Sequence, residues 1–163
     1  MQSRRQVLAV LATAAGLTPL VGWLAGARGR PAAGDFPVQQ SDAAWRAALT
    51  PAQYRVLRTG ATERPFSSPL DDEARDGIFA CAGCGRALFS SAHKFDSGTG
   101  WPSFDEPLAG AVATRLDLSW LMVRTEVHCA GCGGHLGHRF ADGPEPTGLR
   151  YCINGLALEF LTT

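Results

Sequence analysis

The sequence predicts a mainly β domain with antiparallel strands. After Gly77 no helical period remains, and short apolar runs alternate with glycine-rich turns, a pattern typical of antiparallel sheets. The clearest strand covers residues 121–128, where Leu121, Val123, Thr125 and Val127 alternate with Met122, Arg124, Glu126 and His128. Because successive side chains of a strand point to opposite faces, we expect one face to be buried and the other to meet solvent.

One helix and five further strands complete the predicted fold. Thr50 can cap the helix, Pro51 suits its first position and Gln53 can complete a capping box, so a helix should begin here and end by Gly60. The weaker strand candidates are residues 77–80, 86–89, 111–116, 151–153 and 156–161.

The N-terminal residues have the layout of a targeting signal. Arg4 and Arg5 precede 21 uncharged residues, 7–27, which end in Ala-Gly-Ala. This predicts an export leader over 1–27 that resembles a twin-arginine signal, with Val7 in place of the more usual aromatic residue. We therefore expect a periplasmic or otherwise extracytoplasmic protein. A stretch of 21 residues can also just span a bilayer, so a retained leader that anchors the chain to the membrane stays open.

The remaining organisation is a linker followed by one domain. Residues 28–40 are rich in Gly, Pro and Ala without hydrophobic period and predict a linker. The folded domain should cover 41–163. Fifteen basic residues balance fifteen acidic ones, and no basic block follows the N-terminus. The sequence therefore argues against nucleic acid as a partner.

Four of the five cysteines form two copies of the pentapeptide Cys-Ala-Gly-Cys-Gly, at 81–85 and 129–133. Two such knuckles can place Cys81, Cys84, Cys129 and Cys132 around one tetrahedral zinc ion, and the Gly after each pair permits the left-handed turn that this needs. A site with four cysteine ligands is coordinatively full, so its role would be structural. Disulfides, favoured by an oxidising compartment, and a thioredoxin-like dithiol are the alternatives.

The fifth cysteine, Cys152, remains as a single thiol once the other four are assigned to the metal. Upstream lie His135 and His138, three residues apart, and an imidazole or Arg150 near the thiol would raise its thiolate fraction. Cys152, His135 and His138 together predict a reactive site. An inert buried thiol and structural histidines are the alternative.

Trp101 follows a glycine-rich turn instead of lying within a strand. It can be an ordinary core residue. As a site residue, its flat apolar face would receive a methyl group bonded to sulfur.

These motifs together resemble the B-type methionine-R-sulfoxide reductases over residues 41–161. The motifs are Cys81-x-x-Cys84, the segment Ser97-Gly-Thr-Gly-Trp-Pro-Ser-Phe104, Cys129-x-x-Cys132, Gly134-His-Leu-Gly-His138 and Arg150-Tyr-Cys-Ile-Asn154. The resemblance implies two antiparallel sheets with short N-terminal helices and a structural zinc distant from the active site. It implies Cys152 as nucleophile, His135, His138 and Asn154 as polar catalytic residues and Trp101 as the methyl-binding aromatic. We expect Arg150 and Phe140 to contact substrate as well.

The reaction that the resemblance implies is reduction of methionine-R-sulfoxide, in proteins or peptides, to methionine. Cys152 attacks sulfur, His138 with His135 protonates the oxygen, and a Cys152 sulfenic acid remains. Many relatives carry a resolving cysteine where this chain has Thr99, so we expect an external thiol, thioredoxin-like or glutaredoxin-like, to reduce the enzyme. Gly155 and Arg139 also depart from the usual Ser and Val.

Three other functions stay as alternatives. A zinc-knuckle adaptor or chaperone module would need neither Cys152 nor the histidines. A cysteine peptidase could use Cys152, His135 and Asn154, and an anchored thiol-oxidase partner is the third.

Overall fold

The structure, a computed structural model, describes residues 36–163. The predicted leader and most of the predicted linker lie outside the described residues. Two short helices come first, α1 (Asp42–Ala48) and α2 (Pro51–Thr59). The predicted α2 is confirmed with its capping box, and Gly60 ends it in the left-handed conformation (φ 72°). Within residues 36–163 no helix is long and apolar enough to cross a bilayer.

In residues 36–163 nine strands form two antiparallel sheets, which confirms the two sheets that the resemblance implied. The smaller sheet has the order β2-β1-β9, with β1 (Gly77–Cys81), β2 (Ala87–Ser90) and β9 (Leu158–Thr162). The larger sheet has the order β3-β4-β8-β7-β6-β5. Its strands are β3 (Lys94–Phe95), β4 (Ser103–Phe104), β5 (Val112–Asp117), β6 (Arg124–Cys129), β7 (His135–Phe140) and β8 (Arg150–Ile153).

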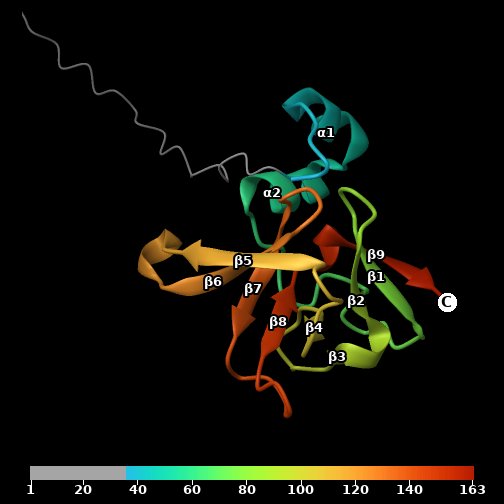
Figure 1. The fold of residues 1–163 in the computed structure, drawn as a ribbon, viewed down its shortest axis with the longest axis vertical. Coiled ribbons are helices and arrows are strands. Elements are labelled where there is room, and N and C mark those ends of the chain that lie inside the picture. Colours follow the sequence, from blue (N-terminus) through green and yellow to red (C-terminus); the bar gives the residue numbers. More distant parts are fainter. Residues whose placement is uncertain (1–35) are drawn as a thin grey trace, which may run out of the picture.

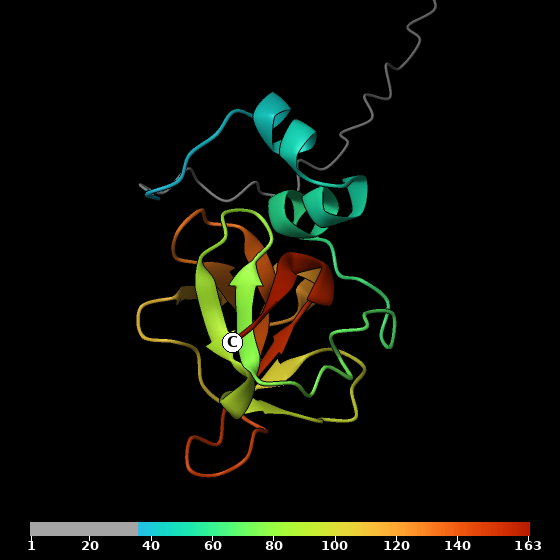
Figure 2. The ribbon, with the colours of Figure 1, turned by 90° about the vertical axis from the view of Figure 1, so that its right-hand side faces the viewer.

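The sheets lie side by side, and the helices cover one end of them (Figures 1 and 2). The core is aromatic where the sheets meet. Phe104 of the larger sheet stacks on Phe89 of the smaller one, with ring centroids 4.3 Å apart, and contacts Phe79 edge-on at 5.0 Å. Val56 and Leu57 bury the inner face of α2 against this core. Burial of these apolar side chains therefore holds sheets and helices together.

Two details of the strongest predicted strand are wrong. Strand β6 begins at Arg124, because Leu121 belongs to a 3₁₀ turn, η2 (Ser119–Leu121), and has a positive φ of 57°. Its polar face is also not solvent-exposed. Glu126 and His128 are both buried, because Glu126 binds His135 and the ring of Phe36 lies edge-on to His128 at 5.8 Å.

Three strands of the structure were not predicted from the sequence. Strands β3 and β4 have only two residues each, too few for a period to appear. Strand β7 contains the two histidines and two small or charged residues, which conceal its alternation. It nevertheless occupies an interior position of the larger sheet.

Residues 36–40, the last part of the predicted linker, lie against the domain. The Val38 N–H donates to the Gly131 carbonyl at 2.9 Å. The ring of Phe36 occupies the space where a side chain at Gly133 would project. This segment therefore covers the turn between β6 and β7.

Candidate active site and cysteine cluster

Strand β8 presents the predicted nucleophile. Arg150, Cys152 and, just beyond the strand, Asn154 alternate with Tyr151 and Ile153, which belong to the buried core. Alternation along a strand therefore turns the three polar residues away from the core.

Cys152 opens into a small cavity of about 150 Å³. The cavity is lined by Thr62, Trp101, Arg124, Gly137, His138, Phe140, Cys152 and Asn154. A thiol, an imidazole and an indole from separate parts of the chain thus face the same space.

Strand register brings the imidazole to the thiol. His138 of β7 and Cys152 of β8 are paired directly across the sheet. The strands approach closely because the preceding residue is Gly137, where a Cβ would lie 2.0 Å from the Cys152 carbonyl oxygen. Gly137 is therefore required at the site for steric reasons.

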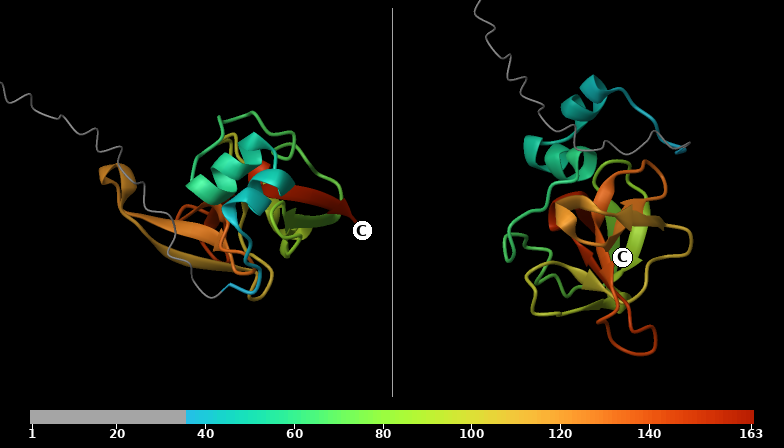
Figure 3. Two further views of the ribbon diagram at one scale, coloured as in Figure 1. Left: turned by 90° about the horizontal axis from the view of Figure 1, so that it is seen from above. Right: turned by 90° about the vertical axis from the view of Figure 1, so that its left-hand side faces the viewer.

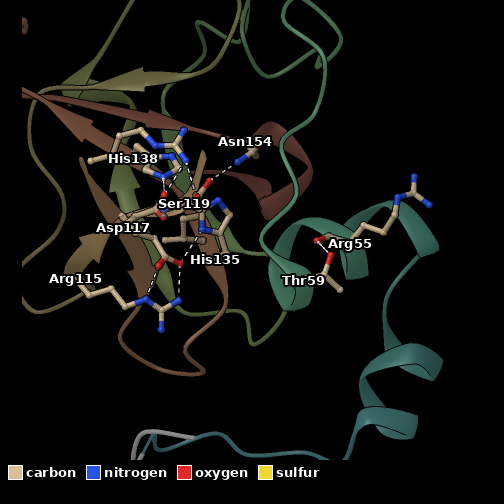
Figure 4. Close-up of polar contacts among 11 residues, drawn as sticks. Arg55, Thr59, Arg115, Asp117, Ser119, His135, His138 and Asn154 are labelled. Carbon is tan, nitrogen blue, oxygen red and sulfur yellow. Dashed lines mark hydrogen bonds and ion pairs between the residues drawn. The ribbon is translucent and has the colours of Figure 1, made fainter. Parts of the chain in front are cut away.

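Each histidine binds its own carboxylate (Figure 4). His135 Nδ1 lies 2.8 Å from Glu126 Oε1, and His138 Nε2 lies 2.7 Å from Asp117 Oδ2. The two rings meet edge-on with centroids 5.4 Å apart. His135 Nε2 is buried without a hydrogen-bond partner among the described residues. Each hydrogen bond fixes the orientation of its ring, and the Asp117 carboxylate favours the protonated form of His138.

Both carboxylates are held ionised. Burial raises the pKa of Glu126, but hydrogen bonds from His135 and Arg115 outweigh it and lower that pKa to about 2. Burial also tends to raise the pKa of Asp117, but hydrogen bonds from Ser119 and His138 hold that pKa well below its usual range. Each histidine can therefore donate to a permanent anion.

The pKa of His138 is lowered overall. Burial has the largest effect, and the hydrogen bond to Asp117 opposes it. The ring therefore gives up a proton more readily than an exposed histidine, as a proton donor must.

The pKa of Cys152 is raised by burial, and the Arg150 charge and hydrogen bonds from Arg150 and Thr99 act against that rise. Arg150 is itself fixed by Asp142, with two hydrogen bonds of 2.9 Å each, while its Nη1 is buried without a partner among the described residues. The guanidinium also lies over the Phe140 ring, 4.8 Å from its centroid. Arg150 thus supplies the positive charge that favours the thiolate.

Glu63 joins Asn154 and Trp101 into one network. The Glu63 N–H donates to Asn154 Oδ1 at 2.9 Å, and the Glu63 carbonyl accepts from Trp101 Nε1 at 3.3 Å. Its buried carboxylate accepts from the N–H groups of Gly155 and Leu156. Burial raises the pKa of Glu63, against these two bonds. A single residue therefore positions both the indole and the turn after Cys152.

Most of the predicted site residues meet in the cavity. Cys152, His138, Asn154, Trp101 and Phe140 all line it. His135 lies beside the His138 ring and Arg150 beside the thiol, but neither lines the cavity. The amide of Asn154 binds the backbone of Glu63 and Leu136 and neither histidine.

Sequence reasoning missed the carboxylates that support the site, at positions 63, 117 and 126. Glu126 had a usable signal, since an acidic residue lay inside the strongest predicted strand. Asp117 follows another predicted strand directly. Glu63 lies in a segment without any period, so only the fold reveals its contacts.

The four remaining cysteines gather at one place, as predicted. Their Sγ atoms all lie within 4.8 Å of one another, with 3.8 Å between Cys81 and Cys132 and 3.6 Å between Cys84 and Cys129. Sulfurs bound to a tetrahedral zinc at about 2.3 Å are about 3.8 Å apart, so the cluster fits that ion. All four are free thiols, and the structure does not support the disulfide alternative.

The two knuckles belong to different sheets. One forms the turn between β1 and β2, and the other forms the turn between β6 and β7. Gly85 and Gly133 have φ of 71° and 67°, which confirms the predicted left-handed turns. A metal ion held here would join the two sheets.

Comparison with known proteins identifies the family. The SelR domain model matches residues 49–162. Three similar relatives are each named "Peptide methionine sulfoxide reductase MsrB". The protein of Agrobacterium fabrum is 56% identical over 124 residues, covering 76% of this chain and 92% of its own. The protein of Bradyrhizobium diazoefficiens is 56% identical over 126 residues, covering 77% of this chain and 91% of its own. The protein of Thiobacillus denitrificans is 57% identical over 122 residues, covering 74% of this chain and 92% of its own. The chain therefore belongs to the SelR domain family, together with these MsrB proteins.

Proposed function

We propose that this chain reduces the R-epimer of methionine sulfoxide, within peptides or proteins, to methionine. The observation that carries the proposal is the cavity into which Cys152, His138 and Trp101 all open. The names of its relatives, peptide methionine sulfoxide reductases, support the same reaction.

The first step needs a nucleophile and an acid on the same sulfoxide. The Cys152 thiolate attacks the electrophilic sulfur while His138, bound to Asp117, protonates the oxygen. Oxygen passes to the thiol, so a sulfoxide and a thiol become a thioether and a sulfenic acid. Sulfur of the substrate is reduced by two electrons and Cys152 is oxidised by two. Trp101 packs against the methyl group.

The second step requires an external thiol. Two thiol groups of a thioredoxin-like or glutaredoxin-like donor, or of dithiothreitol, reduce the sulfenic acid, giving a disulfide, water and the Cys152 thiol. Support comes from the cysteine count: of five cysteines, four form the cluster and none lies at position 99.

The proposal includes one zinc ion bound by Cys81, Cys84, Cys129 and Cys132. Four thiolates this close repel one another unless a cation neutralises them, and the sulfur spacing suits zinc. All four coordination positions would be filled by protein, so the ion stabilises the fold and takes no part in the reaction.

The proposed location is outside the cytoplasm. Its support is the sequence pattern of residues 1–27, which resembles a twin-arginine leader. N-terminal sequencing of the protein recovered from the periplasm should begin at Arg28 if the leader is cleaved. Membrane attachment would require a retained leader.

One assay tests the reaction, its stereochemistry and the nucleophile together. The purified chain and its Cys152→Ser variant are incubated with the separated R- and S-sulfoxides of N-acetylmethionine and with dithiothreitol. We expect N-acetylmethionine only from the R-epimer and only with Cys152 present. Equal reduction of both epimers, or turnover by Cys152→Ser, would overturn the proposal.

A further inference from the structure

The end of the β5–β6 hairpin is an exposed apolar surface. Residues 118–123, the hairpin tip, contain no charged side chain, and Figure 3 shows this end of the hairpin projecting from the rest of the fold. Its exposed large apolar residues are Leu118, Trp120, Leu121, Met122 and Val123. Contiguous apolar surface of this kind commonly marks a binding site.

Backbone geometry holds these side chains outward. Trp120 and Leu121 have φ of 59° and 57°, the left-handed region that residues with a Cβ disfavour. Trp120 is 71% exposed, and the side chain of Leu121 is fully exposed. An unfavourable conformation that exposes apolar side chains is consistent with a role in binding.

The hairpin tip begins and ends at residues of the active site. Asp117, directly before it, binds His138 at 2.7 Å and accepts from Arg124 Nη2 at 2.8 Å. Arg124, directly after it, lines the cavity and also donates to Ser119 Oγ at 3.1 Å. The tip is therefore continuous with the rim of the cavity.

Apolar surface continues elsewhere around the cavity. Phe140 lines it and is partly exposed. Phe66 is exposed, and its N–H donates at 2.7 Å to the carbonyl of Gly100, the residue before Trp101. A chain entering the cavity would thus meet apolar surface beside Trp101 as well as beside His138.

We propose that the hairpin tip binds apolar residues flanking the methionine sulfoxide in an unfolded segment of an oxidised protein. This inference rests on the proposed function. The cavity, about 150 Å³, is smaller than the roughly 300–1,000 Å³ of pockets for drug-sized ligands, so it holds one side chain. The residues on either side must then cross the rim.

Charge favours a polypeptide over an anionic membrane as the occupant. The two charged residues that flank the tip, Asp117 and Arg124, are paired with each other. Binding to anionic lipid would instead call for unpaired basic residues at the surface. Apolar flanking residues are usually buried in folded proteins, so an unfolded segment would offer them.

The test compares three substrates that share one reacting group. They are N-acetylmethionine-R-sulfoxide methylamide, a peptide with methionine-R-sulfoxide between leucine and valine residues, and the same peptide with serine and glycine flanks. For the full-length chain we expect kcat/KM to be about tenfold higher for the apolar peptide than for the polar one. The double variant Trp120→Ser/Leu121→Gly should lose this preference and keep its rate on the methylamide within about twofold.

Two controls separate docking from folding. Glycine at position 121 suits the positive φ, so the variant should melt near the wild-type temperature. Leu161→Ser removes exposed apolar surface from β9 of the other sheet and should leave the peptide preference unchanged.

Several results would overturn the inference. Equal rates on both peptides, or an equal loss by the double variant on all three substrates, would show that the tip does not bind flanking residues. A dimer, or binding to phosphatidylcholine/phosphatidylglycerol vesicles, that the double variant loses while the peptide preference remains would assign the surface to a second copy or a membrane. No turnover of any substrate by the wild type would overturn the proposed function and this inference together.

Discussion

His138 and Cys152 face each other across adjacent antiparallel strands, in register and on the same side of the sheet. Directly opposed residues have Cβ atoms about 4.5–5.5 Å apart. The distance between thiol and imidazole is therefore set by main-chain hydrogen bonds of β7 and β8 and by the close approach at Gly137. Such a site needs little rearrangement before substrate binds.

Replacing His138 by asparagine should lower kcat by about 10²–10⁴-fold without abolishing it, because a general acid contributes roughly that factor. Asparagine cannot supply the proton, and its amide corresponds in position to Nδ1 instead of the Nε2 atom that binds Asp117. His93→Asn is the matched control, since His93 pairs with Asp105 outside the cavity. A near-normal rate for His138→Asn would remove His138 from the mechanism.

The pH profile should depend on Arg150. Burial raises the pKa of Cys152 and the Arg150 charge opposes this, so Arg150→Met should raise that pKa further. The thiolate exists above its pKa, and the rising limb of kcat/KM against pH should therefore move to higher pH. Arg150→Lys keeps a cation and should shift the limb less. A limb that stays in place or moves to lower pH in Arg150→Met would contradict this account.

Glu63 should act as a positioning residue. In Glu63→Gln one oxygen becomes an NH₂ group that cannot accept from the N–H of Gly155 or Leu156. Leaving a buried N–H without a partner costs about 1–3 kcal/mol in the free energy of unfolding. Because Trp101 binds the Glu63 carbonyl, we expect KM to rise more than kcat falls. The exposed Glu159→Gln is the control, and a kcat loss with unchanged KM would argue against positioning of the indole.

Cys84→Ser should release the metal. We expect about one zinc per wild-type chain and almost none in the variant, with a melting temperature lower by at least about 10 °C, since metal binding contributes directly to folding. Cys152→Ser should retain its zinc. Full stability of Cys84→Ser, or a metal-free wild type, would refute a structural zinc.

Local signals predicted much of the fold. The capping residues of α2 act within one turn of the chain, and the glycines after each cysteine pair are required by the turn itself, so both were predicted correctly. The start of β6 was predicted wrongly, because the apolar residues at 121 and 123 are exposed on the hairpin tip. Alternation alone does not distinguish an apolar residue facing a core from one exposed at the end of a hairpin.

The site was predictable only in part. The reactive residue types could be recognised in the sequence: a lone cysteine, two histidines and a tryptophan after a glycine-rich turn. The carboxylates could not, because Glu63 meets Gly155 across 92 positions and Asp117 meets His138 across 21. Contacts at such separations depend on strand order and register, which no local pattern specifies.

In the proposed reaction Cys152 takes the oxygen from the substrate, and a single turnover tests this step most directly. The full-length chain is mixed with one equivalent of a peptide methionine-R-sulfoxide, without reductant, and its cysteines are analysed by mass spectrometry after trapping with dimedone. We predict one methionine per chain and a sulfenic acid at Cys152. Thr99→Cys should instead give a 99–152 disulfide, since Thr99 lies near enough to the Cys152 thiol to lower its pKa. Methionine formed while Cys152 remains a thiol, or a wild-type disulfide between Cys152 and a clustered cysteine, would contradict the account.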